Sequence, residues 1–359
     1  MTPNCRVASN SSIMENKKPF SLAERPAQLL NRSLLGLSLN RLLTLGVFVV
    51  LFAIFSVFAH NFFTVRSMLN LLVQTSTFTI LSIGATVVLI VGGIDFSLGA
   101  VVACSGTAVV VFAGIGMPIW ISMIAAISLG GMIGSISGFL VVRMRLPSFL
   151  TTFAMAGLVY GILGFAAFVG SHAPPLHVPA SLGNLANNPV FTIFSHDVTG
   201  ARIVAFPGVS WIVIIMVFVA VLFHLLLTKT RIGRYTHLAG SNQEASRLSG
   251  IKDIRVRTMA YVLAGLLAGL VGVLLASRLS APPGAAVGYE IIGIECAMIG
   301  GASLAGGVGS VGGTVIASFI LSTLSMGLTM MNANPYIPTF LNGFVVLGAV
   351  YLDQIRIRK

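Results

Sequence analysis

Three acidic side chains lie in or beside apolar stretches of the sequence, and they are the groups there with the most chemical potential. They are Asp95, Glu290 and Glu295. Asp95 directly precedes an apolar run, so its carboxylate can accept hydrogen bonds from the free amides of a first helical turn. We interpret Asp95 as a structural cap in preference to a substrate ligand. Glu290 stands at the start of another apolar run, where the same capping argument applies.

Glu295 lies deeper in its apolar run than Glu290. A charged group in a bilayer normally faces a cavity or a partner, so Glu295 has three possible roles: neutralising an arginine, lining a transport pathway, or being protonated. The two glutamates are five positions apart in the sequence, which places them about 140° apart around a helix. We therefore expect no paired catalytic site, and keep Glu290 and Glu295 as candidate pathway residues.

Motifs for enzymatic chemistry are absent from the sequence. It contains no GxxxxGK[ST] and no Gly-Lys pair, so ATP binding through a P-loop is excluded, and it contains neither HExxH nor GxSxG. The histidines are scattered without metal-ligand spacing. Cys5, Cys104 and Cys296 form no disulfide framework. We expect no catalytic residue, no metal and no cofactor.

The composition indicates an integral membrane protein. Of the 359 residues, 56% are hydrophobic and 8% are charged, whereas a soluble domain has about 25% charged residues. The net charge of +12 raises the possibility of nucleic-acid binding. We reject it, because the positive charges lie at the ends of apolar runs and not on one soluble face.

The apolar runs predict an all-α polytopic membrane protein, because a span needs about 20 apolar residues. We expect a tail at residues 1–41, a transmembrane domain at 42–352 and a second tail at 353–359. About ten transmembrane helices are expected, broken or short near the glycine-rich motifs, at residues 42–59, 68–91, 96–114, a fourth ending near 142, 147–170, 209–227, 259–276, 289–301, 314–331 and a tenth ending near 351.

The distribution of basic residues predicts the orientation. Ten spans put both termini on one side. With the N-terminus in the cytoplasm, only Arg66, Arg202 and Arg278 lie outside, which is three of the 21 Lys and Arg residues. This agrees with the retention of Lys and Arg on the cytoplasmic side. The connections 171–207 and 277–288 would then be external.

One long basic segment, residues 229–257, separates the two apolar halves. Its middle, Ser241 to Gly250, predicts a short helix, because Asn242 can cap the first turn and glycine adopts the left-handed conformation that ends a helix. A short helix on the cytoplasmic face suits docking to a soluble partner. The alternative is a solvated loop that only fixes the topology.

Two glycine-rich stretches, residues 90–103 and 298–317, have a similar pattern: apolar helix, glycine break with a small polar residue, apolar helix. Glycine-interrupted segments in corresponding places of two halves point to a transport pathway; the alternative is two tight turns at the membrane surface. Small residues also recur at helical spacing, which favours close helix packing. These rows are Gly130, Gly134 and Gly138; Gly157 and Gly161; Gly265 and Gly269; Gly309 and Gly313.

Three stretches resemble one family. VGGIDFSLGA, residues 91–100, resembles the GGIDLSVG signature of ribose-type sugar permeases of ATP-binding-cassette (ABC) importers. GSNQEASRLSGI, residues 240–251, resembles the GxNxxAARLSGI cytoplasmic segment of that family. Residues 278–317 resemble its GxGYELxAIAAVVLGGTSLxGGxGxxxGT region. The resemblance covers nearly the whole chain from about Leu42 onward, with modest departures such as Ser246, Phe96 and Cys296.

The resemblance implies a permease subunit in the inner membrane, with no ATPase chemistry of its own. It implies as partners a second copy of the chain, two ATPase subunits or a fused double ATPase, and a periplasmic sugar-binding protein; membrane lipid would surround the spans and nucleic acid is not expected. The ATPase-coupling positions that match are Asn242, Glu244, Ala245, Arg247 and Gly250. The structural motif positions that match are Gly92, Gly93, Asp95, Ser97, Gly99, Gly300, Gly301, Gly306 and Gly307.

The resemblance therefore implies import of a monosaccharide, either a pentose, a hexose or a related polyol. One alternative is an importer for another small solute, such as an amino acid or a nucleoside. Another is a secondary transporter driven by an ion gradient, which would act without any ATPase and would depend on Asp95 or Glu295. A membrane-embedded enzyme would need a cluster of nucleophile, base or metal ligands that the sequence lacks.

Overall fold

The computed structural model describes residues 44–169, 182–184, 190, 193–196, 202–206, 208–279, 286–334 and 336–357. The expected tail at residues 1–41, most of the connection 171–207, part of the connection 277–288 and the last two residues lie outside this range. What was expected of them stays a prediction.

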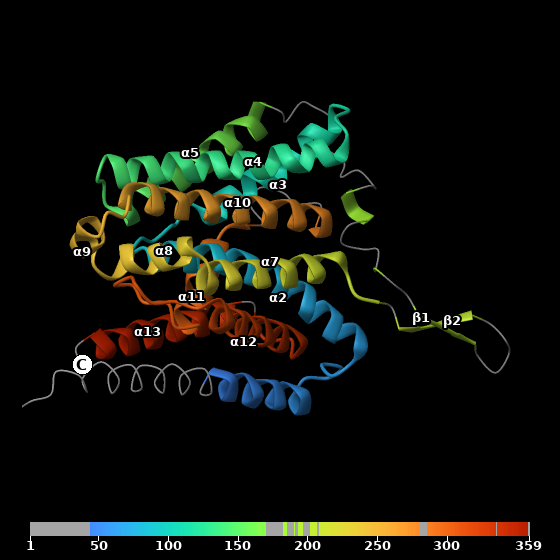
Figure 1. Ribbon diagram of the computed structural model, residues 1–359. Helices are drawn as coiled ribbons and strands as arrows, with labels where there is room; N and C mark the ends of the chain where they lie inside the picture. The colour runs from blue at the N-terminus through green and yellow to red at the C-terminus, as the bar shows by residue number, and fades with distance from the viewer. Residues whose placement is uncertain are drawn as a thin grey trace, which may run out of the picture. The chain divides into compact units, whose positions relative to one another are not determined.

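The described chain is mainly helical, and its helices follow the apolar runs and run side by side (Figure 1). In chain order the helices are Thr44–Phe58, α2 (Val65–Ile90), α3 (Leu98–Gly114), α4 (Ile119–Gly138) with its π-helical extension η1 (Phe139–Arg143), α5 (Ser148–Val169), α7 (Trp211–Lys229), α8 (Arg231–Ser241), α9 (Gln243–Leu248), α10 (Asp253–Leu279), α11 (Tyr289–Ile299), α12 (Val311–Met330) and α13 (Tyr336–Ile357).

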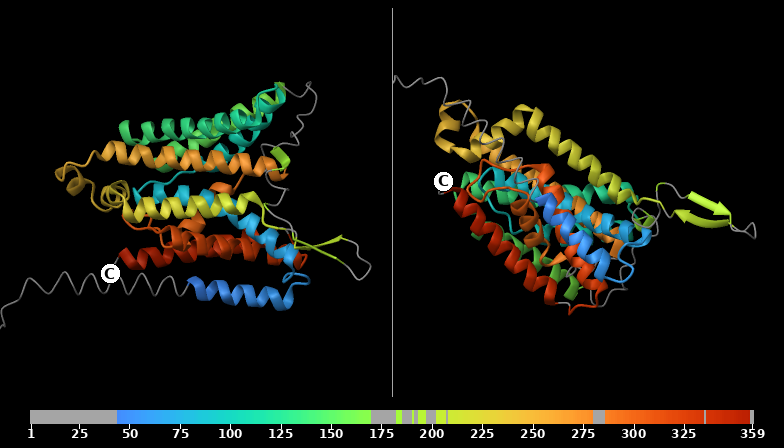
Figure 2. Two further views of the ribbon diagram at one scale, coloured as in Figure 1. Left: turned by 45° about the vertical axis from the view of Figure 1, so that its right-hand side comes forward. Right: turned by 90° about the horizontal axis from the view of Figure 1, so that it is seen from below.

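One small hairpin departs from the expected all-α fold. Strands β1 (Ile193–His196) and β2 (Arg202–Phe206) pair antiparallel inside the connection that follows α5. Figures 1 and 2 show the hairpin at the end of the bundle opposite α9. The connection was expected to be a long polar stretch, and the strands were missed because Ile193–His196 and Arg202–Phe206 lack the apolar/polar alternation of a half-buried strand.

Among the described residues, six helices are long and apolar enough to cross a membrane, and each lies at the place of an expected span. They are Val65–Ile90, Ile119–Arg143, Ser148–Phe168, Trp211–Lys229, Asp253–Arg278 and Val311–Met330. Thr44–Phe58, Leu98–Gly114 and Tyr336–Gly348 are shorter apolar helices, and α11 has 11 residues. Both α3 and α11 adjoin a glycine-rich motif, as expected for interrupted helices.

The outward face of α5 carries exposed apolar side chains. Phe153, Ile162, Phe165 and Phe168 are more than half exposed, with Phe168 at 76%. In water such a row would be an aggregation hazard, whereas in a bilayer it is the face that contacts lipid. The fold therefore has the exposed apolar surface that the composition predicted.

Helices α4 and α10 pack closely against each other through their glycines. A Cβ placed on Gly130 would lie 2.9 Å from Gly269 Cα, and one on Gly265 would lie 3.0 Å from Gly134 Cα. Backbone therefore contacts backbone, which only residues without a side chain allow. The prediction that these glycine rows mediate helix packing is confirmed.

The other glycine rows differ in their surroundings. Gly138 packs against α10 and Gly309 against Ile90, as expected. Gly157 and Gly161 on α5 have nothing within 4 Å among the described residues. For that row the packing prediction is wrong within the chain, because the row lies on the outward face of α5.

Candidate coupling site

Helix α9 has the capping residues that the sequence predicted. Asn242 has an extended backbone, and its Oδ1 accepts a hydrogen bond from Ala245 N at 3.0 Å. Gly250 follows with a φ of +76°. The helix itself runs from Gln243 to Leu248, shorter than the expected 241–250.

The two faces of α9 have different environments. Ser246 is 2% exposed and packs inward, whereas Leu248 is 84% exposed. A leucine this exposed on a polar helix gains free energy only when a partner covers it. Glu244 and Arg247 line a cavity between α9 and the start of α10.

The basic segment is more ordered than the expected loop with one short helix. It contains α8 as well as α9, and α10 begins inside it at Asp253. Thr230 caps α8, with its hydroxyl accepting from Gly233 N at 3.3 Å. A threonine directly before a helical run is an N-cap signal, and the surrounding charges obscured it in the sequence.

Three backbone segments that are distant in sequence meet at the C-terminal end of α8. Gly307 N donates to Ile90 O at 2.8 Å. Nδ1 of His237 lies 2.9 Å from Gly307 O, to which it donates. A Cβ on Gly240 would overlap Ile90 O and lie 2.6 Å from Gly307 N. The two glycine-rich stretches thus contact each other and the residues that precede α9, and we call this meeting point the glycine junction.

One glycine of the glycine junction, Gly306, is required by the backbone geometry. Gly306 has a φ of +87°, and a Cβ on it would lie 2.8 Å from Gly240 O and 3.0 Å from Gly92 Cα. The left-handed backbone and the close approach together exclude a side chain. Gly92, Gly306 and Gly307 were singled out from the sequence. Gly240 was quoted there only as the first residue of the motif at 240–251, without a role, and His237 was missed.

The break between α2 and α3 obtains its hydrogen bonds from α5. Ser148 Oγ accepts from Ile94 N at 3.3 Å, and Thr152 Oγ1 accepts from Phe96 N at 3.0 Å. Thr152 Oγ1 also lies 3.2 Å from Ile94 O. Non-helical backbone inside a membrane protein must be satisfied by the protein or by water. Ser148 and Thr152 do this, and nothing in their local sequence marked them.

Asp95 has a structural role that differs from the expected helix cap. Its Oδ1 accepts from Ser97 N at 2.8 Å and from Ser97 Oγ at 2.6 Å, while Ser97 is the N-cap residue of α3. The carboxylate therefore fixes the N-cap residue and not the amides of the first turn. Asp95 is 2% exposed, and its Oδ2 has no partner among the described residues.

The two glutamates of α11 occupy separate environments. Glu290 Oε1 accepts from Gly288 N at 3.3 Å, which confirms a capping contact at the start of the helix. Its Oε2 lies against Gly99, where a Cβ would overlap it. Glu295 is 3% exposed, and its Oε2 has no partner in the described part of the chain.

The remaining motif glycines support local turns. Gly93 lies beside Tyr261, and Gly300 packs on the backbone of Gly313 and Thr314 at the start of α12. Gly301 takes a φ of +94°. These positions shape the two breaks without joining the glycine junction.

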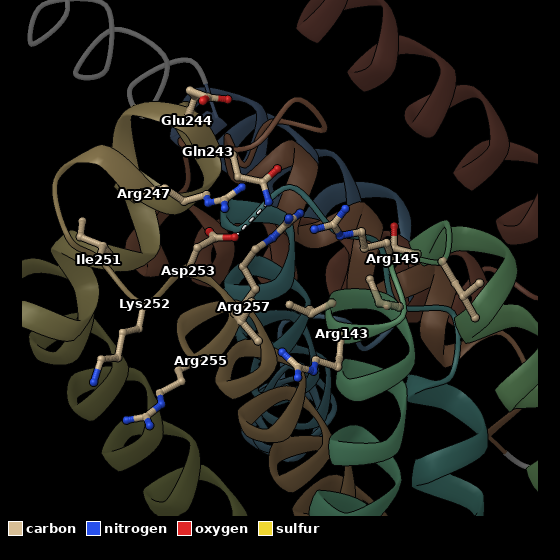
Figure 3. Close-up of a pocket in the computed structure, with 15 residues that line it drawn as sticks. Arg143, Arg145, Gln243, Glu244, Arg247, Ile251, Lys252, Asp253, Arg255 and Arg257 are labelled. Carbon is tan, nitrogen blue, oxygen red and sulfur yellow. Dashed lines mark hydrogen bonds between the residues drawn. The ribbon is translucent and has the colours of Figure 1, made fainter.

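A cavity of about 880 Å³ adjoins α9 and is lined by Gln243, Glu244 and Arg247 of that helix (Figure 3). It lies between α9, the start of α10 and the turn from η1 to α5. Among the residues that the structure describes, no group of three or more His, Cys, Asp or Glu side chains could hold a metal ion.

Comparisons with known proteins find permease proteins of sugar transport systems that are similar in sequence to this chain. The chain is 36% identical over 306 residues, covering 85% of this chain and 91% of the relative, to the ribose import permease protein RbsC of Escherichia coli K12. It is 30% identical over 313 residues, 87% and 90% of the two chains, to the L-arabinose transport system permease protein AraH of the same organism. It is 29% identical over 319 residues, 89% and 88%, to the L-arabinose ABC transporter permease protein AraH of Azospirillum brasilense.

A family model also matches most of the chain. Residues 67–350 match the model described as branched-chain amino acid transport system / permease component. The matched range includes both glycine-rich stretches, α8 and α9, and therefore all of the glycine junction. The chain belongs to this family of transport-system permease components.

Proposed function

We propose that this chain is the membrane-spanning permease subunit of an ABC importer for a monosaccharide. The observation that carries the proposal is the 36% identity over 306 residues to a ribose import permease. The L-arabinose relatives support the same class of solute. The sugar could be a pentose, a hexose or a related polyol. The family description names amino acids, so branched-chain amino acids are the second candidate substrate class.

In this proposal α9 docks on an ATPase subunit and the glycine junction carries the displacement inward. Leu248 is the apolar contact, and Asn242, Glu244, Ala245, Arg247 and Gly250 shape and present the helix. The support is the 84% exposure of Leu248 together with the contacts of Gly240 with Ile90 and Gly307. Through these contacts a movement of α9 would reach both glycine-rich breaks.

The proposal also includes a membrane arrangement. The chain would cross the inner membrane about ten times with both termini in the cytoplasm, and two copies would form the translocation unit. Two ATPase subunits, or a fused double ATPase, would dock at the α9 end. A periplasmic sugar-binding protein would dock at the end that carries the β1–β2 hairpin. Glu290 and Glu295 remain proposed pathway residues.

The transport experiment uses proteoliposomes that contain the full-length permease. Uptake of radiolabelled ribose, arabinose, hexoses and leucine is measured with and without the ATPase subunits, the binding protein and ATP. Sugar uptake that needs both partners and ATP is expected. Uptake of leucine, and of none of the sugars, would show that the substrate is a branched-chain amino acid. Uptake by the permease alone, driven by an ion gradient, would refute the importer assignment.

A second experiment tests docking through α9. We expect Leu248→Asp to abolish co-purification of the ATPase subunits while leaving the melting temperature of the permease unchanged, because Leu248 contacts little within the chain. Val287→Asp is the matched control. It is also exposed, at 64%, but lies next to α11 and outside the basic segment. Equal ATPase binding by both variants would refute docking through Leu248.

A further inference from the structure

The cavity beside α9 is lined by six cationic and two acidic residues, together with apolar side chains. The cationic residues come from three elements: Arg143 and Arg145 from the turn between η1 and α5, Arg247 from α9, and Lys252, Arg255 and Arg257 from the start of α10. Such an excess of positive charge in one cavity favours an anionic occupant.

Three of these arginines converge on one space. Figure 3 shows Arg145, Arg247 and Arg257 pointing toward one another from the turn, from α9 and from α10. Lys252 and Arg255 line the same cavity but point away from that space (Figure 3). Arg145 has a φ of +58°, a backbone conformation that costs free energy for a residue with a side chain.

The converging arginines have no acidic partner of their own. No ion pair links the described residues of the cavity to one another, although the carboxylate of Asp253 lies beside the converging arginines (Figure 3). Asp253 is buried, and its Oδ2 accepts from Gln243 Nε2 at 3.0 Å, which ties α9 to α10. Its Oδ1 has no hydrogen-bond partner among the described residues, so one unpaired acidic oxygen lies in a cavity lined by six cationic side chains. Glu244 points away from the arginines at the edge of the cavity (Figure 3). Arginine guanidinium groups without an internal partner are well suited to bidentate binding of a phosphate group.

The position and the remaining lining of the cavity indicate the source of that phosphate. Three candidate membrane spans, Ile119–Arg143, Ser148–Phe168 and Asp253–Arg278, end or begin at the cavity. The cavity therefore lies at the level where a span meets the lipid headgroups. Val141, Leu146 and Ile254 add an apolar side to the lining. A glycerophospholipid offers both components, a phosphate for the arginines and a glycerol–acyl region for the aliphatic side chains.

We propose that Arg145, Arg247 and Arg257 bind the headgroup phosphate of an anionic phospholipid, such as phosphatidylglycerol, at the cytoplasmic face. The lipid bridges α9, the start of α10 and the turn before α5. Arg257 also approaches the glycine junction, since its Nη2 lies 4.0 Å from the Cβ position of Gly92. Occupancy of the cavity therefore fixes α9 relative to the first glycine-rich break. This proposal does not depend on which solute the protein transports.

Native mass spectrometry of the full-length permease in detergent tests the assignment. The protein is titrated with dihexanoyl phosphatidylglycerol, with dihexanoyl phosphatidylcholine and with inorganic phosphate. Arg145→Gln/Arg247→Gln removes two converging charges, and Lys252→Gln/Arg255→Gln removes two charges from the same cavity that point away. Each arginine near an anionic headgroup contributes roughly fivefold to affinity, so the first pair is expected to weaken phosphatidylglycerol binding about 30-fold.

The control pair is expected to bind phosphatidylglycerol within about threefold of the wild type, since its charges lie outside the converging set. Arg145→Lys keeps the charge and is expected to retain part of the affinity; it also covers the case in which the double variant does not fold. Equal binding of the two lipids, or equal losses in the two double variants, would overturn the proposal. So would displacement of the lipid by equimolar inorganic phosphate.

A protein occupant gives a different result. If ATPase subunits bound the lipid-free permease through Arg145 and Arg247 while lipid binding was unaffected by their replacement, the cavity would be a protein-docking site. That outcome would overturn the lipid assignment and leave the proposed function intact. Absence of sugar uptake by the reconstituted importer, together with a retained preference for phosphatidylglycerol, would overturn the proposed function and leave the lipid assignment intact.

Discussion

Replacement of Gly240 by alanine perturbs the glycine junction at its most crowded point. The new Cβ would overlap Ile90 O and lie 2.6 Å from Gly307 N. The 2.8 Å hydrogen bond between those two groups cannot persist with a methyl group between them. Because all the atoms concerned are backbone, no side-chain rotation relieves the overlap.

The change in the free energy of unfolding is the sum of two destabilising contributions and one stabilising contribution. Moving backbone apart in a packed region costs about 1–3 kcal/mol, and the lost hydrogen bond adds about 1 kcal/mol. Alanine is a better helix former than glycine in α8, which returns about 1 kcal/mol. The net expectation for Gly240→Ala is a loss of about 2 kcal/mol in the free energy of unfolding.

Thermal unfolding of the detergent-solubilised permease measures this loss, with Gly157→Ala as the matched control. Gly157 is also helical but has nothing within 4 Å, so alanine there gains up to about 1 kcal/mol. We expect the melting temperature to fall by a few degrees for Gly240→Ala and to stay level or rise for Gly157→Ala. Melting temperatures that shift equally in both variants would refute the close backbone contact at Gly240.

Three further predictions test the surroundings of the glycine junction. Asn242→Ala removes the α9 cap at a cost of about 1 kcal/mol and should weaken co-purification of the ATPase subunits. Asn242→Asp keeps a capping oxygen and should not. Equal co-purification by the two variants would exclude a role for the cap. Thr152→Val removes the hydroxyl that satisfies the break before α3 and should lower the free energy of unfolding by about 1–3 kcal/mol, with Thr152→Ser close to wild type. Gly99→Ala should lower the free energy of unfolding by about 1–3 kcal/mol, because the new Cβ would overlap Glu290 Oε2. Adding Glu290→Ala should recover part of that loss in a double-mutant cycle. Strictly additive losses would contradict the contact between Gly99 and Glu290.

Local signals in the sequence predicted the short helix α9 and the two glycine breaks. Asn242 and Gly250 act within a few residues of their own positions, so their roles can be read without the fold. The composition and the apolar runs likewise predicted a helical membrane protein, because span length depends only on bilayer thickness.

The contacts that connect these elements could not be predicted in the same way. Gly240 meets Ile90 and Gly307 across long stretches of chain, and no single sequence shows which glycines approach one another. The same holds for Thr152, whose hydroxyl serves a break more than 50 residues earlier. For Asp95, even a contact within a few residues was predicted only in part. The sequence placed its role at the start of α3, but the amide that it binds is that of Ser97 and not one in the first turn of the helix.

The glycine contacts between α4 and α10 determine how a displacement at α9 can travel. With backbone touching backbone, the two helices interlock, and α10 is about 40 Å long at 1.5 Å per residue. Gln243 ties α9 to Asp253 at one end of α10. If α9 docks on an ATPase subunit as proposed, a displacement at that end of α10 would be carried along the helix to its far end, next to the connection before α11. The glycine breaks in the neighbouring helices would then be the places where the backbone can bend.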